Sequence, residues 1–318
     1  MKEEDNWVNL IKMFCVLIVL LGHYNFTDWK GTKWLIYTVK SAVSVMFIYS
    51  GYYLCKNKTL EEHEKTKKYL EHLGKIVIVW AFLGFLYDVF YSDKTIEAIR
   101  KIFQDDMFEF VRFDYGHLWY IQNLFLAVAI MFIFKKKHFE VWEVILLIVL
   151  QKCYYWLLIC ALASIGIGYI LADTEKVFDK KKMITCLCTG VIAVVILCGF
   201  SYGWLSMGEW GKEIVIETMR YVLAVSVAVF GLSLDSLVPL DFGVTGRYIR
   251  KLSTVIYLSH MMFIEPSFQV AAHNGALWGE KDYFIYSAGT AVILSIVTGI
   301  VLIIASERKL FRWLKEIF

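Results

Sequence analysis

Proline is scarce in this sequence, and charged side chains are fewer than in a typical soluble domain. Only two of its 318 residues are proline, and Asp, Glu, Lys and Arg together make up 20% of the chain. Soluble domains carry about 25% charged residues and distribute them more evenly along the chain. The low charge therefore argues against a water-soluble enzyme of this size. No Gly/Ser/Pro-rich tract, repeat or low-complexity stretch marks a linker, so we expect one domain over residues 1–318.

The cysteine patterns of zinc and redox sites are also missing. No two cysteines have CxxC spacing, and most of them lie inside apolar runs, as small hydrophobic side chains do. We therefore expect no metal site. The net charge of +3 is too small to indicate a nucleic-acid partner, and we expect none. The cysteines are Cys15, Cys55, Cys153, Cys160, Cys186, Cys188 and Cys198.

Long hydrophobic runs are what the chain has in abundance, because 58% of its residues are hydrophobic and 17% are aromatic. A helix needs about 20 apolar residues to cross the hydrocarbon core of a bilayer. The sequence predicts an all-α protein, a polytopic membrane helix bundle of about ten transmembrane helices. The fifth of these segments is shorter than a full crossing. They cover residues 7–25, 34–54, 75–91, 117–134, 141–150, 153–172, 184–202, 214–232, 252–271 and 283–305.

The connecting segments indicate the orientation of this bundle. Lysine and arginine concentrate in every second loop and in the C-terminal tail, which predicts that both termini are cytoplasmic. The first run lacks a small-residue cleavage site and is expected to be retained. Residues 56–74 are dense in Lys, Glu and His and predict a solvated helix along the inner surface, or simply a charged topological anchor. Residues 92–116 place Phe and Met at helical spacing and predict an amphipathic helix capping a site at the outer surface.

The first hydrophobic run carries two ionisable side chains, Lys12 and His23. Their spacing of eleven residues brings them to within about 20° of one helix face, about 16 Å apart along the axis. Charged groups inside a membrane span are costly and usually face a cavity or a functional site. A histidine at the end of a span is otherwise an interfacial residue that donates to a backbone carbonyl.

Polar residues recur in three other segments. His117 opens the fourth segment, and Gln122 and Asn123 follow it one turn deeper. His260 lies midway along the ninth segment, with Tyr257 on the same helix face.

Glu217 and Arg220 stand three residues apart in the eighth segment, which predicts an ion pair. Such a pair is more often a structural clasp between helices than a catalytic element.

Four stretches together resemble one known family. They are the Lys12 to His23 spacing, FIYSGYYL at residues 47–54, GHLWYIQNLF beginning at residue 116, and LSTVIYLSH at residues 252–260. In this order the sequence resembles the acyltransferase-3 family of bacterial integral membrane O-acyltransferases. Lys12 stands where the family has arginine, which keeps the charge and loses the bidentate fork that suits phosphate. Asn9 stands where an acidic residue is common.

The resemblance implies an acyl-CoA-dependent O-acetyltransferase in the bacterial cytoplasmic (inner) membrane. Acetyl-CoA would be the acyl donor, and a hydroxyl of an extracytoplasmic carbohydrate or lipid-linked sugar the acceptor. His23 is expected to act as general base or transient acyl carrier, with Glu217 or another carboxylate orienting its ring and His117, Gln122 or Asn123 stabilising the oxyanion. Residues expected to bind CoA or substrate are Lys12, a turn at Ser50 and Gly51, Lys68, Lys75, Trp119, Asn123, Arg220, Tyr257 and His260.

Two other functional classes stay open at this point. The membrane half of the serine racemases of vancomycin-resistant bacteria resembles the same family, which makes a transporter of a small solute such as serine the alternative. An accessory subunit of a polysaccharide-assembly complex is the other. Membrane lipids are expected partners in every case, and the oligomeric state, a homodimer included, is left open.

Overall fold

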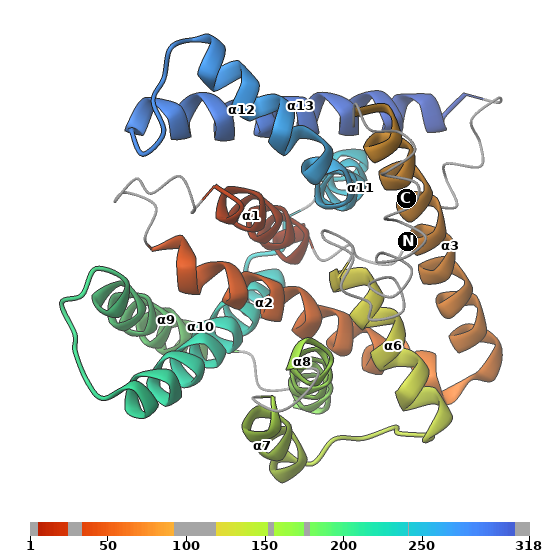
Figure 1. Cartoon of the computed structure of the whole chain (residues 1–318). Helices are drawn as coiled ribbons and strands as arrows, with labels where there is room; N and C mark the ends of the chain where they lie inside the picture. The colour runs from red at the N-terminus through yellow and green to blue at the C-terminus, as the bar shows by residue number, and fades with distance from the viewer. Residues whose placement is uncertain are drawn as a thin grey trace.

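The computed structural model describes residues 6–24, 34–91, 119–151, 156–174, 179–240 and 242–308. All regular structure in these ranges is helical, so the predicted all-α class is confirmed (Figure 1). Short 3-10 turns at Thr59–Glu61 and His260–Phe263 join some of the helices. The α-helices are α1 (Asn6–Gly22), α2 (Leu35–Lys56), α3 (His63–Tyr91), α6 (Trp119–Ile133), α7 (Val141–Leu150), α8 (Trp156–Asp173), α9 (Lys180–Ser201), α10 (Glu209–Leu237), α11 (Val244–Ser259), α12 (Ile264–His273) and α13 (Lys281–Ser306).

Three of the described helices are long and apolar enough to cross a membrane, namely α9, α10 from Trp210 to Leu237, and α13. Helices α1, α6, α7 and α8 are apolar but shorter. Large hydrophobic side chains on α9 and α13 face outward, among them Val195 at 61% exposed and Ile293 at 62% exposed. Such outward-facing apolar surfaces suit lipid rather than water. The number of crossings and their orientation stay predictions.

Helix α2 occupies the centre of the bundle, packed against α1, α8 and α10 (Figure 1). The crossing of α2 with α8 brings the two backbones together at a pair of glycines. A Cβ on Gly51 would lie 2.2 Å from the carbonyl oxygen of Ile165, and a Cβ on Gly168 would lie 2.1 Å from that of Ile48. The prediction of a turn at Ser50 and Gly51 is therefore wrong. Both residues lie inside α2, and the α8 backbone occupies the space beside Gly51.

Two predicted boundaries also differ from the structure. The charged stretch 56–74 does not form a separate surface helix, because its second half continues without interruption into the apolar part of α3. The ninth segment is not one continuous α-helix either, since α11 ends at Ser259, a 3-10 turn follows, and α12 begins at Ile264. Pro266 in the first turn of α12 explains this break, because proline in a continuous helix would clash with the carbonyl four residues earlier. His260 therefore lies at a helix break and not midway along a span.

Helix α1 is held at both of its ends. The Asp235 carboxylate of α10 accepts hydrogen bonds from the backbone N–H groups of Trp7 at 2.8 Å and Val8 at 3.0 Å. A carboxylate at this position satisfies two otherwise unbonded N–H groups and complements the helix dipole. At the other end the buried Tyr24 hydroxyl lies 2.7 Å from the Ser267 hydroxyl of α12. These contacts fix the helix that carries Lys12 and leads into His23.

Candidate active site

His23 and His260 lie side by side, although one follows α1 and the other follows α11. Their ring centroids are 5.0 Å apart, and the ring planes are inclined by 41°. His260 is 1% exposed, and its Nδ1 donates to the backbone carbonyl oxygen of Tyr257 at 2.5 Å. A carbonyl only accepts, so Nδ1 carries a proton and Nε2 is the nitrogen that remains for proton exchange. The break after α11 is what turns this ring toward the end of α1.

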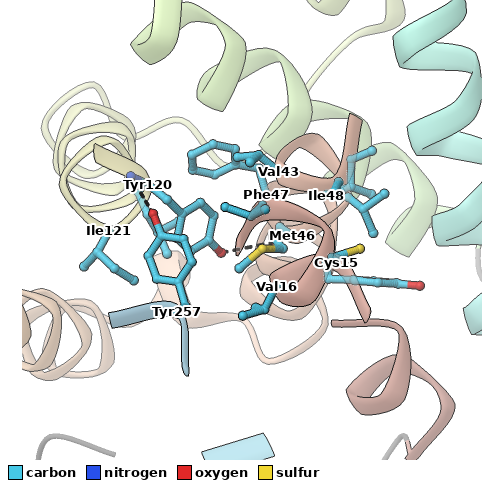
Figure 2. Packing of buried hydrophobic residues seen from close by; sticks show 14 of the residues in the cluster. Cys15, Val16, Val43, Met46, Phe47, Ile48, Tyr120, Ile121 and Tyr257 are labelled. Atoms are coloured by element: carbon cyan, nitrogen blue, oxygen red, sulfur yellow. Dashed lines mark hydrogen bonds between the residues drawn. The ribbon is translucent and has the colours of Figure 1, made fainter. Parts of the chain in front are cut away.

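Tyr257 and Tyr120 connect the histidine pair to α6 and α2 (Figure 2). The Tyr257 ring lies 5.7 Å from the His260 ring and 5.4 Å from that of Tyr120. The Tyr257 hydroxyl accepts from the backbone N–H of Tyr120 at 3.3 Å, which satisfies one of the first N–H groups of α6. The Tyr120 hydroxyl in turn lies 3.1 Å from the Ser50 hydroxyl of α2. The stretches of α2, α6 and α11 that carry the family resemblance therefore meet at one place.

Lys12 holds its ammonium group against two tyrosine rings of α2. The ammonium nitrogen lies 5.0 Å from the ring centroid of Tyr53 and 5.7 Å from that of Tyr49. Both distances are in the range of a cation–π interaction. Helix α1 thus carries a cation in its first half and ends at Gly22, directly before His23, slightly earlier than the predicted segment.

Glu217 and Arg220 form the ion pair that their spacing predicts, with Arg220 almost fully buried. The Gln151 amide, at the end of α7, donates to the Glu217 carboxylate at 3.0 Å and accepts from the Tyr221 hydroxyl at 2.9 Å. These bonds join α10 to the end of α7, as expected for a structural clasp between helices. The Glu217 carboxylate thus binds Arg220 and Gln151. The ring that contacts His23 is that of His260. We leave Glu217 and Arg220 out of the reacting centre.

The other predicted site residues are more scattered. Trp119 begins α6, and its carbonyl accepts from the Asn123 amide at 2.6 Å. Lys68 and Lys75 occupy exposed positions on α3, and their part in CoA binding stays a prediction. His117 and the amphipathic helix expected over residues 92–116 lie outside the described residues. Among the residues that the structure describes, no group of three or more His, Cys, Asp or Glu is arranged to hold a metal ion.

Tyr120 gains an importance that the sequence patterns did not indicate, and Gln122, already a candidate oxyanion donor, has a distinctive environment. Tyr120 stands at the junction of α2, α6 and α11, but a tyrosine in an aromatic-rich run carries no distinctive spacing. Gln122 is 1% exposed, and neither amide atom has a hydrogen-bond partner within the described ranges. A buried amide that is left unpaired is costly, so such a group is suited to bind a ligand.

Comparison with known proteins agrees with this geometry. The model of one protein family, described as an acyltransferase domain, matches residues 5–306. No curated protein and no solved structure matches the chain. The family match supports acyl transfer in a membrane and does not favour the transport alternative. The chain that brings His23 and His260 together belongs to the acyltransferase-3 family and is a membrane acyltransferase.

Proposed function

We propose that this protein takes an acetyl group from cytoplasmic acetyl-CoA and transfers it to a hydroxyl of an extracytoplasmic carbohydrate or lipid-linked sugar. The proposed location is the bacterial inner membrane, with ten crossings and both termini in the cytoplasm. The observation that carries the proposal is the contact of the His23 and His260 rings at 5.0 Å, at the end of a helix that also carries Lys12.

Lys12 is the proposed anchor for the anionic end of the acyl donor. With the N-terminus in the cytoplasm, Lys12 lies in the inner half of α1 and His23 lies toward the outer surface. A cation against two tyrosine rings attracts phosphate, and the partly buried Tyr53 ring offers a flat surface to an adenine ring or a pantetheine chain. The thioester then reaches His23 about 16 Å farther along α1.

His23 is the proposed general base. It removes the proton of the acceptor hydroxyl, whose oxygen attacks the thioester carbonyl carbon. The tetrahedral intermediate collapses, the carbon–sulfur bond breaks, and the CoA thiolate takes up the proton held by His23. His260 stays neutral throughout this reaction. Two charged imidazoles 5.0 Å apart would repel each other, and the Tyr257 carbonyl holds the proton on Nδ1 of His260. A covalent acetyl-His23 intermediate is the alternative route through the same atoms.

Gln122 is the proposed donor to the oxyanion. The sequence offers His117, Gln122 and Asn123 as oxyanion donors, and of these the Asn123 amide already donates to the Trp119 carbonyl. The Gln122 amide is buried and has no bonding partner among the described residues, so the developing negative charge on the thioester oxygen would satisfy it.

Turnover of radiolabelled acetyl-CoA by the purified protein tests this proposal. His23→Ala should lower acetyl transfer about a hundredfold or more, because a positioned base contributes that much. His138→Ala is the matched control, since this histidine is exposed in the connection between α6 and α7 and should leave the rate unchanged. Equal turnover in His23→Ala and wild type, at equal amounts of folded protein, would overturn the proposal.

A further inference from the structure

A groove of about 260 Å³ runs between α9 and α10, on a part of the molecule that the proposed chemistry does not use. The two helices lie side by side over much of their length (Figure 1). Both helices line the groove, among others with Gly190, Val191 and Val195 of α9 and with Leu223, Ser226 and Phe230 of α10.

Small residues produce this hollow. A Cβ on Gly190 would lie 3.3 Å from the Ser226 Cβ, so the helices approach closely there and larger side chains rise on both sides. The Ser226 hydroxyl is bonded to the Thr189 hydroxyl at 3.0 Å. With its hydroxyl satisfied in this way, the groove presents an apolar surface to whatever enters it. An aliphatic chain fits this surface and a polar solute does not.

The groove opens onto the apolar exterior of the bundle. Both α9 and α10 are among the described helices long enough to cross a membrane. Val191 is 55% exposed and Val195 is 61% exposed, so the open side of the groove faces outward between two candidate spans. The medium at that depth is lipid hydrocarbon.

A cluster of cations stands at one end of the groove. Lys180, Lys181 and Lys182 form the exposed first turn of α9. Their charges lie at the positive end of the helix dipole, which favours an anion there.

Helical spacing divides these three lysines. Lys182 begins the stripe that continues at every fourth residue through Cys186 and Gly190, and Lys182 lies about 6 Å from Cys186 along the axis. Lys180 stands seven residues before Leu187 and shares its face, which also lines the groove. Lys181 lies about 40° around the helix from Val195, and Lys182 lies about 40° from Cys186, so these two lysines flank opposite edges of the groove and Lys180 stands over its middle.

We propose that this groove binds an anionic phospholipid. One acyl chain lies between α9 and α10, and the phosphate contacts Lys180 at the membrane surface, with Lys181 and Lys182 on either side of it. Two observations carry the proposal. One is the apolar groove between two candidate membrane spans, and the other is Lys180 in the first turn of α9, on the helix face that lines the groove. Juxtamembrane lysines attract anionic lipid headgroups in this way.

Native mass spectrometry of the full-length protein tests the headgroup contact. Dioleoyl phosphatidylglycerol is compared with dioleoyl phosphatidylcholine, which has the same chains and no net charge. Wild type should retain phosphatidylglycerol preferentially, and Lys180→Gln should lose about fivefold of that preference, since one lysine near the surface contributes about 1 kcal/mol. Lys181→Gln and Lys182→Gln, at the edges of the groove, should each lose clearly less. Equal retention of the two lipids by wild type, or equal effects of the three lysines, would overturn the proposal.

A photoactivatable phosphatidylglycerol with the reactive group in its acyl chain tests the groove itself. Wild type should be labelled on the groove residues of α9 and α10. Val195→Phe should fill the groove and reduce labelling there severalfold, whereas Ile192→Phe adds the same bulk outside the groove and should not. Labelling spread evenly over all outward faces would contradict a built site. A dimer that shields α9 and α10 from the lipid would assign the groove to a second copy of the chain.

Discussion

Lys12 keeps the positive charge of the family's arginine but has an ammonium group in place of the planar guanidinium. Its ammonium group sits between the rings of Tyr49 and Tyr53, a position in which the charge matters more than a fork of donors. Two other residues make structural contacts in place of those that the sequence suggested. Gly51 packs against α8, and the Glu217 carboxylate binds Arg220 and Gln151.

A prediction at this scale concerns the binding of the acyl donor. Lys12→Ala should raise the KM for acetyl-CoA about tenfold or more and change kcat less, because a charge-assisted contact to the donor is lost. Lys12→Arg should retain most of the affinity, since a guanidinium also stacks on tyrosine rings. Titration of each purified variant with acetyl-CoA measures the effect. Unchanged affinity in Lys12→Ala would remove Lys12 from the donor site.

Helix packing determines where the site lies, and the close crossing of α2 with α8 is its most constrained point. Gly51→Ala would place a Cβ 2.2 Å from a backbone carbonyl oxygen that cannot rotate away. We expect this change to destabilise the protein by about 1–3 kcal/mol or more, as overpacking does. Gly289→Ala is the control, because no heavy atom lies within 4 Å of the added Cβ in α13. That variant should be as stable as wild type or up to about 1 kcal/mol more stable. Thermal unfolding in detergent compares the two, and equal midpoints would contradict the crossing.

The elements differ in how well their sequences predict them. Helices α9 and α13 are predictable from the sequence, because each is a long apolar run. The Glu217–Arg220 ion pair is predictable because the two residues lie three positions apart in one helix. The break at His260 is harder to see, since the apolar run continues through it and only Pro266, six residues later, signals a new helix. The continuity of α3 is harder to predict, because its charged first part looks like a surface helix and its apolar second part like a separate membrane span.

At the scale of the whole molecule, tertiary packing brings together what the sequence keeps far apart. His23 and His260 were both visible as unusual residues in apolar segments, but no local pattern states that their rings touch. That contact depends on the clamps at both ends of α1, made by Asp235 and Ser267, and on the turn between α11 and α12. The sequence thus supports the class of protein and its candidate residues, and the packing supports their arrangement.

The central claim is that His23 and His260 act as one unit in acetyl transfer, and a double-mutant cycle tests it most directly. The turnover of acetyl-CoA is measured for wild type, His23→Ala, His260→Ala and the double variant, with His138→Ala as the control. Residues that act together are strongly non-additive. We predict that the double variant is about as slow as His23→Ala alone. A double variant whose loss equals the product of the two single losses would show independent roles and contradict the account.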